Sequence, residues 1–169
     1  MQNPITIPAL TAKVTEIFSV AGLHPQQAAA MARTLVAGER DGCKSHGVYR
    51  IEGALRTVKA GKVNAGAEPE LIVDETGIVR VAANGGYSPW AFELGAPVLA
   101  DKARQLGLAA LVINDCVHFT ALWPEVEALA SFGVASIAMC PSYATVAPAG
   151  SSAAASIHAC AAVSTCAPS

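Results

Sequence analysis

Residues 108–139, LAALVINDCVHFTALWPEVEALASFGVASIAM, contain the pattern that decides the fold. The apolar run Leu108 to Ile113 predicts a buried strand, and the Ala- and Leu-rich stretch after Tyr87 predicts a helix that leads into it. Residues Trp123 to Ser131 and Val134 to Met139 then repeat the order of helix and strand. This alternation predicts an α/β fold with a mixed or partly parallel sheet.

Helical periodicity fills the amino-terminal part of the chain. The first predicted helix stops at Gly22, the second starts at Pro25 and the third stops near Gly61. The apolar positions at helical spacing are Leu10, Val14 and Phe18, then Ala28, Met31 and Leu35, then Val48, Ile51, Leu55 and Val58. We expect residues 1–62 to form a helical segment in which the first two helices pack as a hairpin.

Two β-rich runs follow this helical segment. Leu71 to Val73 and Ile78 to Val81 flank a short polar stretch that ends in Gly77, which predicts a β-hairpin. They open an α/β portion that spans residues 63–149.

The last segment, residues 150–169, has a different composition. It is almost entirely Ala, Ser, Cys and Thr, without a charged residue and without amphipathic periodicity. A flexible linker is one interpretation. Because linkers rarely contain Cys and His, we favour the hypothesis that this low-complexity tail is read out of frame after a deletion or frameshift. Sequencing the gene here would refute it if no frame restored a patterned α/β sequence.

Composition excludes several classes of protein. Hydrophobic residues make up 53% and charged residues 14%, which argues against disorder and favours an oligomer. The 11 basic and 13 acidic residues leave no positive surplus, so no nucleic acid partner is expected. The chain begins without a signal-like pattern and lacks the roughly 20 apolar residues of a membrane span. We therefore expect a cytoplasmic protein that does not enter the membrane.

The cysteines give no sign of a disulfide framework or a metal site. Their number is odd, no Cys-x-x-Cys pair occurs, and reduced thiols are expected. Cys116 and His118 are close in sequence, but two ligands do not complete a tetrahedral site. The sequence predicts no bound metal.

A compact group of polar residues, Ser45, His46 and Arg50, lies at the start of the third predicted helix. His46 and Arg50 are four residues apart and would share a helical face. An imidazole can transfer a proton near neutral pH and a guanidinium can grip a carboxylate, which suits the reduction of a 2-imino or 2-oxo acid. The alternative is a serine helix cap beside a surface histidine.

A second group, Asp115 to Pro124, follows the buried strand in a loop of the kind that binds ligands in α/β proteins. Gly85 and Gly86 do not form the Gly-x-Gly-x-x-Gly fingerprint, so a bound dinucleotide would not use a Rossmann loop.

Three motifs together resemble the type 2 malate/L-lactate dehydrogenases in order and separation. They are SHGVYR at Ser45–Arg50, HFTALWPEVE at His118–Glu127 and VAP at Val146–Pro148. The resemblance runs from about Ile5 to Pro148. Around Trp123 and Pro124 the chain is most similar to the branch that reduces delta-1-piperideine-2-carboxylate and delta-1-pyrroline-2-carboxylate.

The resemblance implies a non-Rossmann nicotinamide-binding fold and assigns roles to individual residues. Ser45 and His46 would belong to the catalytic relay, with His46 as proton donor, and Arg50 would contact the substrate carboxylate. The segment lining the cofactor, NADPH or NADH, would comprise His118, Phe119, Thr120, Ala121 and Leu122. The implied reactions yield L-proline and L-pipecolate from a small-molecule substrate, in a homodimer. The alternatives are a malate or lactate dehydrogenase and a non-catalytic fragment.

The chain also departs from the family pattern. Val117 stands where close relatives often carry a polar residue or a histidine. The family continues for roughly as many residues again beyond Pro148, so the α/β cofactor-binding portion is incomplete and the C-terminal half is missing. The missing half would contain the relay aspartate and a Gly-Thr-Asn-Pro-like substrate segment, neither of which has a match in residues 150–169. No residue that reads the ribose 2′ position is identifiable, so the choice between NADPH and NADH stays open.

Overall fold

The computed structural model describes residues 4–73, 77–118, 120–146, 155–158 and 162–164. The chain divides into two compact units, Met1–Ala121 and Leu122–Ser169. In chain order the first unit contains α1 (Ile7–Val20), α2 (Pro25–Arg40), the 3-10 turn η1 (Lys44–His46), α3 (Arg50–Lys59), β1 (Glu70–Val73), β2 (Ile78–Ala82), α4 (Ser88–Leu106) and β3 (Ala110–Asn114).

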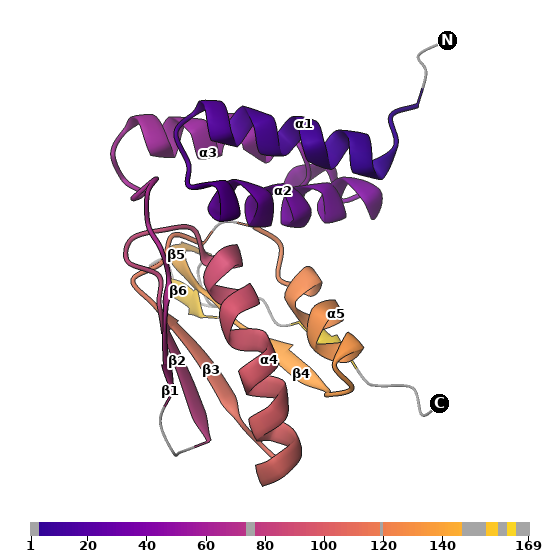
Figure 1. The fold of residues 1–169 in the computed structure, drawn as a ribbon, viewed down its shortest axis with the longest axis vertical. Helices are drawn as coiled ribbons and strands as arrows, with labels where there is room; N and C mark the ends of the chain where they lie inside the picture. Colours follow the sequence, from indigo (N-terminus) through magenta and orange to yellow (C-terminus); the bar gives the residue numbers. More distant parts are fainter. Residues whose placement is uncertain (1–3, 74–76, 119, 147–154, 159–161, 165–169) are drawn as a thin grey trace. The chain divides into compact units, whose positions relative to one another are not determined.

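The three amino-terminal helices lie beside one another (Figure 1). The Oγ1 atom of Thr6 caps α1 by accepting the Ala9 N–H at 3.4 Å. Before α2, Nδ1 of His24 accepts the Gln26 N–H at 3.3 Å, and the helix begins at Pro25 as predicted. The amino-terminal helices expected from the sequence are present, and the caps of α1 and α2 satisfy amides left without helical partners.

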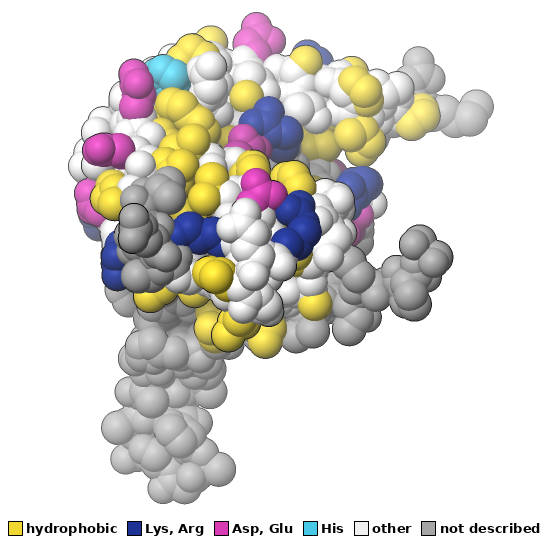
Figure 2. Space-filling model, turned by 60° about the horizontal axis from the view of Figure 1, so that its bottom comes forward, with side chains coloured by type: hydrophobic (Ala, Val, Ile, Leu, Met, Phe, Trp, Pro, Cys, Tyr) yellow, Lys and Arg dark blue, Asp and Glu magenta, His cyan; other side chains and the backbone are white. Residues whose placement is uncertain are grey.

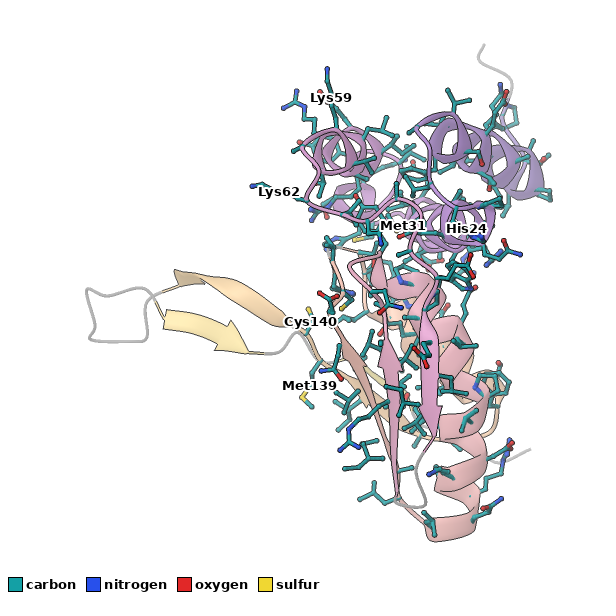
Figure 3. All side chains as sticks on the ribbon, turned by 60° about the vertical axis from the view of Figure 1, so that its left-hand side comes forward. His24, Met31, Lys59, Lys62, Met139 and Cys140 are labelled. Carbon is teal, nitrogen blue, oxygen red and sulfur yellow. The ribbon has the colours of Figure 1, made fainter. Side chains whose placement is uncertain are left out.

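The helices enclose one apolar cluster, whose buried members include Val14, Phe18, Leu23, Ala28, Met31, Leu35, Ala54 and Tyr87. Figure 3 shows Met31 inside the helical layer, while the Lys59 and Lys62 side chains point outward. Val48 and Val117 pack against the same cluster from segments far apart in sequence. This core lies next to the two polar groups described below, because Val48 is close in sequence to Ser45 and His46, and Val117 directly precedes His118.

The three-stranded sheet is mixed, with the order β1-β2-β3. Strand β1 pairs antiparallel with β2, with Leu71 opposite Val81, and β2 pairs parallel with β3, with Val81 opposite Ile113. Both the predicted hairpin and the predicted mixed sheet are confirmed.

Helix α4 packs along one face of this sheet (Figure 1). A Cβ atom at Gly95 would lie 2.6 Å from Leu111 Cδ1, so the glycine allows the helix to approach closely. The helix follows β2 and its first turn therefore lies at the carboxyl ends of β2 and β3. In α/β proteins this edge is where ligands usually bind.

A buried polar network joins the helical layer to the sheet. The Tyr87 hydroxyl donates to the Ala54 carbonyl of α3 at 2.9 Å, and the Tyr87 N–H donates to Gln27 Oε1 at 2.6 Å. Nε2 of Gln27 in turn donates to the Ala65 carbonyl at 2.8 Å. Burial raises the pKa of Tyr87 to about 12, so its hydroxyl stays a donor at neutral pH.

The second unit contains α5 (Trp123–Ser131), β4 (Ser136–Ala138), β5 (Pro141–Val146), β6 (Ala155–His158) and β7 (Ala162–Ser164). Strand β4 pairs with β7 and β5 with β6, both antiparallel, and α5 packs against β4 and β7. The sequence predicted α5 and β4. It predicted no pattern in the tail, where the structure has β6 and β7.

On the face in Figure 2, basic and acidic side chains are interspersed among apolar ones. None of the helices in the described ranges combines the length and the apolar character needed to cross a membrane.

Candidate functional site

Ser45 and His46 lie in the short turn η1 between α2 and α3. The Ser45 hydroxyl is 3.0 Å from Nδ1 of His46, within hydrogen-bonding distance. The Cys43 thiol lies on the same side of the ring, with Sγ 3.5 Å from Nδ1 and 3.8 Å from the Ser45 hydroxyl. The predicted pair is thus in direct contact, and a thiol that the sequence did not single out joins it.

The end of α2 holds this turn in place. Oε1 of Glu39 pairs with the Lys44 ammonium and Oε2 accepts the Val48 N–H at 3.3 Å, so one carboxylate clamps both sides of the turn. The hydrogen bond from Lys44 holds the pKa of Glu39 below its usual range, although partial burial opposes the shift. Gly38 allows the close approach, since a Cβ atom there would lie 2.5 Å from the His46 carbonyl oxygen.

Arg50 reaches the turn by a route that the sequence did not predict. We expected His46 and Arg50 on one face of a single helix, but Gly47 has φ −89° and ψ −146° and ends η1, and α3 begins only at Arg50. A Cβ atom at Gly47 would lie 3.2 Å from Glu39 Cα, which leaves little room for a side chain. Nε of Arg50 instead donates to the Ser45 carbonyl at 2.6 Å. The helical-face prediction is wrong, although the three residues do gather.

Two effects lower the pKa of His46. Partial burial is the larger, and the positive charge of Arg50 is the second. Both disfavour the imidazolium form, so in the ligand-free chain His46 is held toward its neutral state. An anion that neutralised Arg50 would remove the second effect and raise the pKa.

The second group lies where the loops after β2 and β3 run side by side. The Gly85 N–H donates to the Asp115 carbonyl at 2.8 Å, and the Val117 N–H donates to the Gly86 carbonyl at 2.8 Å. The Ser88 N–H then donates to the Val117 carbonyl at 3.1 Å. Val117, the departure from the family pattern, therefore joins the loops through its backbone while its side chain packs on the core.

This arrangement brings Ser88 to His118. Ser88 is buried at the start of α4, and its hydroxyl is 2.7 Å from Nδ1 of His118. Nε2 of His118 and Oγ1 of Thr120 are both buried and have no hydrogen-bond partner among the described residues. Burial lowers the pKa of His118, partly offset by a hydrogen bond with the Thr120 backbone, and so favours the neutral ring. Buried polar atoms without partners are uncommon, and a bound group that forms hydrogen bonds with them is one explanation.

The other predicted cofactor residues differ in character. Ala121 and Leu122 are buried and apolar, and Phe119 lies outside the described residues. Ser88 was missed in the sequence, although Ser88-Pro89 after two glycines is a helix-start signal. Its contact with His118 depends on the parallel pairing of β2 and β3, which the sequence did not specify.

Comparison with known proteins assigns the family. The family model described as malate/L-lactate dehydrogenase matches residues 5–163. The chain belongs to the malate/L-lactate dehydrogenase family. The match runs past Pro148, where we expected the resemblance to end, and so includes most of the tail that we interpreted as out of frame.

Two similar relatives in this family are reductases of cyclic imino acids. The chain is 63% identical over 147 residues to the delta(1)-pyrroline-2-carboxylate reductase of Agrobacterium fabrum, covering 86% of this chain and 43% of the relative. It is 58% identical over 121 residues to the delta(1)-pyrroline-2-carboxylate/delta(1)-piperideine-2-carboxylate reductase of Pseudomonas aeruginosa, covering 72% of this chain and 36% of the relative. The chain thus spans less than half the length of these malate/L-lactate dehydrogenase family members.

A solved structure is similar to this chain in fold as well as in sequence. The delta1-piperideine-2-carboxylate reductase from Pseudomonas syringae pathovar tomato superposes with a TM-score of 0.85 and 34% identity, covering 93% of this chain and 47% of that one. The α/β fold predicted from the sequence is therefore a malate/L-lactate dehydrogenase fold.

Proposed function

We propose that this chain is the amino-terminal part of a nicotinamide-dependent reductase of cyclic imino acids, with delta-1-pyrroline-2-carboxylate and delta-1-piperideine-2-carboxylate as substrates. The observation that carries the proposal is the contact of Ser45 with His46 in a turn onto which Arg50 folds. A proton donor beside a carboxylate-binding cation is what reduction of a C=N bond next to a carboxylate requires.

Arg50 is proposed to bind the substrate carboxylate. Because a guanidinium carries five N–H donors, Arg50 can hold the Ser45 carbonyl and a carboxylate at once. The bound carboxylate would neutralise the charge that depresses the pKa of His46. Substrate binding would therefore favour the imidazolium, so that His46 becomes charged when a proton is needed.

His46 is proposed to give this proton to the ring nitrogen of the substrate. The C=N bond then becomes a C–N single bond with hydrogen on both atoms, and His46 returns to its neutral form. Ser45 contacts Nδ1 at 3.0 Å and so fixes the ring orientation, and Nε2 is the proposed atom for proton transfer. Cys43 lies on the same Nδ1 side.

The second group fits a nicotinamide dinucleotide. His118 and Thr120 present buried polar atoms that lack hydrogen-bond partners in the described chain, at the sheet edge where α4 begins. When bound, the dinucleotide, NADPH or NADH, supplies the hydride for C2 of the imino acid. Ser88 holds His118, and the apolar Ala121 is buried in the same segment.

We also propose that the protein forms a homodimer and acts in the cytoplasm. The high apolar fraction of 53% and the low charged fraction of 14% support an oligomer. Light scattering of the purified chain tests this, and a monomeric mass at micromolar concentration would contradict it.

The substrate assignment is tested by parallel assays. Oxidation of NADPH and of NADH is followed at equal concentrations of pyrroline-2-carboxylate, piperideine-2-carboxylate, oxaloacetate and pyruvate. We expect the two imino acids to be reduced faster than the two oxo acids. Faster reduction of oxaloacetate or pyruvate would contradict the proposal and favour a 2-hydroxy acid dehydrogenase, which the family description also accommodates.

A further inference from the structure

Ser88 is a buried residue without an assigned role. Its N–H donates to the Val117 carbonyl at 3.1 Å, and its hydroxyl lies 2.7 Å from Nδ1 of His118. Both ends of the residue are therefore fixed, one by the backbone of the neighbouring loop and the other by the imidazole.

The direction of the hydrogen bond between Ser88 and His118 follows from the hydroxyl hydrogen. A buried hydroxyl needs an acceptor for its hydrogen, and Nδ1 of His118 is the acceptor that the described residues place within reach of Ser88. If Nδ1 instead carried a proton and donated to Ser88, the buried hydroxyl hydrogen would have no acceptor among the described residues. Such a loss costs about 1–3 kcal/mol, which favours the Ser88 hydroxyl as donor.

A neutral histidine that accepts at Nδ1 carries its proton at Nε2. The ring of His118 is held in the neutral form because burial lowers its pKa. Nε2 is the buried atom that has no partner in the described chain. It is therefore an N–H donor without a hydrogen-bond acceptor in good geometry among the described residues, although the Thr120 backbone lies near the ring.

We infer that Ser88 is a positioning residue, which fixes His118 as an Nε2–H donor for an acceptor oxygen of the bound dinucleotide. The ligand half of this inference rests on the proposed function. Such an oxygen is offered by the carbonyl of the nicotinamide amide, by the phosphates and by the riboses. Thr120, whose buried Oγ1 is also without a partner among the described residues, can donate to the same group.

The tautomer is tested without any ligand. In the ¹⁵N-labelled full chain at pH 7.5 (about one unit above the ordinary histidine pKa), long-range ¹H–¹⁵N spectra distinguish a protonated from an unprotonated ring nitrogen. We expect Nδ1 of His118 to be unprotonated in the wild type and in Ser88→Thr, which keeps the hydroxyl. Ser88→Ala should give a mixture of tautomers. A protonated Nδ1 in the wild type would overturn the inference.

The ligand is tested by calorimetric titration with NADPH, ADP-ribose and nicotinamide mononucleotide. Ser88→Ala should weaken NADPH binding about tenfold, the factor for one misdirected buried hydrogen bond, while Ser131→Ala, an exposed serine of α5, should not. Weaker binding of the mononucleotide alone identifies the amide carbonyl, and weaker binding of ADP-ribose identifies a phosphate or ribose oxygen.

The outcomes separate this inference from the proposed function. Unchanged affinity of Ser88→Ala for all three compounds would overturn the inference and leave the reductase proposal intact. Failure of the wild-type chain to bind either NADPH or NADH would contradict the proposed function and the ligand half of the inference together. Thermal denaturation of each variant identifies a loss of binding that comes from unfolding.

Discussion

Gly38 is the position where one added methyl group should disturb the site. A Cβ atom there would lie 2.5 Å from the carbonyl oxygen of His46 and 2.8 Å from its carbon, whereas ordinary contact begins at 3.4 Å. The contacting atoms are backbone, so the η1 turn must move by about 0.9 Å (3.4 minus 2.5). Overpacking of this kind costs about 1–3 kcal/mol.

The better helix propensity of alanine offsets part of this cost, by about 0.5–1 kcal/mol. We expect Gly38→Ala to lower the free energy of unfolding by about 1–2 kcal/mol, which is roughly 2–4 °C in Tm per kcal/mol for a chain of this length. Because His46 is displaced, turnover should fall by about a hundredfold. Urea denaturation and the reductase assay measure the two effects.

Gly53 of α3 provides the matched control. It is also a helical glycine, but a Cβ atom there would have no heavy atom within 4 Å. Gly53→Ala should stabilise the chain by about 0.5–1 kcal/mol and leave turnover unchanged. A Gly38→Ala chain as stable as Gly53→Ala, with full activity, would refute the reasoning about the turn.

Three further changes have definite expected results. Arg50→Met should raise the pKa of His46 in an NMR titration, because the Arg50 charge is the second cause of its depression. Arg56→Met, in the same helix, should leave the pKa of His46 unchanged. An unmoved or lower pKa with Arg50→Met would contradict the proposed effect of the Arg50 charge on His46. The pKa of His118 is depressed on folding, so the unfolded chain takes up a proton first as pH falls below about 6.5. The free energy of unfolding should therefore fall between pH 7 and pH 5, by up to about 1.4 kcal/mol per pH unit for this residue. Urea denaturation at the two pH values should show a smaller fall for His118→Gln than for the wild type. Tyr87→Phe removes a buried hydrogen bond to the Ala54 carbonyl and should cost about 0.5–1.5 kcal/mol in the same assay. A cost below about 0.5 kcal/mol would count against the network.

Much of the fold is local enough to be predicted from the sequence. Apolar spacing, Pro25 and the glycines that follow the helices indicate where α1, α2 and α3 lie, and alternating apolar residues indicate the β1–β2 hairpin. These signals work because each depends on residues within one or two turns of one another.

The sequence predicted most of the residues of the site, but it did not predict how they are arranged. Gly47 interrupts the helix with a non-helical ψ of −146°, and the contact with Glu39 that leaves no room for a side chain there spans eight residues and a turn. Likewise, Ser88 meets His118 across 30 residues because β2 and β3 pair in parallel. Such contacts depend on tertiary packing, which hydrophobic periodicity does not report.

The most direct measurement is the loss of NADPH absorbance when the purified 169-residue chain is incubated with delta-1-pyrroline-2-carboxylate, with His46→Ala measured in parallel. We expect turnover by the wild-type chain that His46→Ala abolishes while the variant still binds NADPH. Equal rates for the two chains would contradict the role of His46. No turnover by either chain, with both folded, would contradict the proposal that this chain carries the reductase chemistry and would favour a non-catalytic fragment.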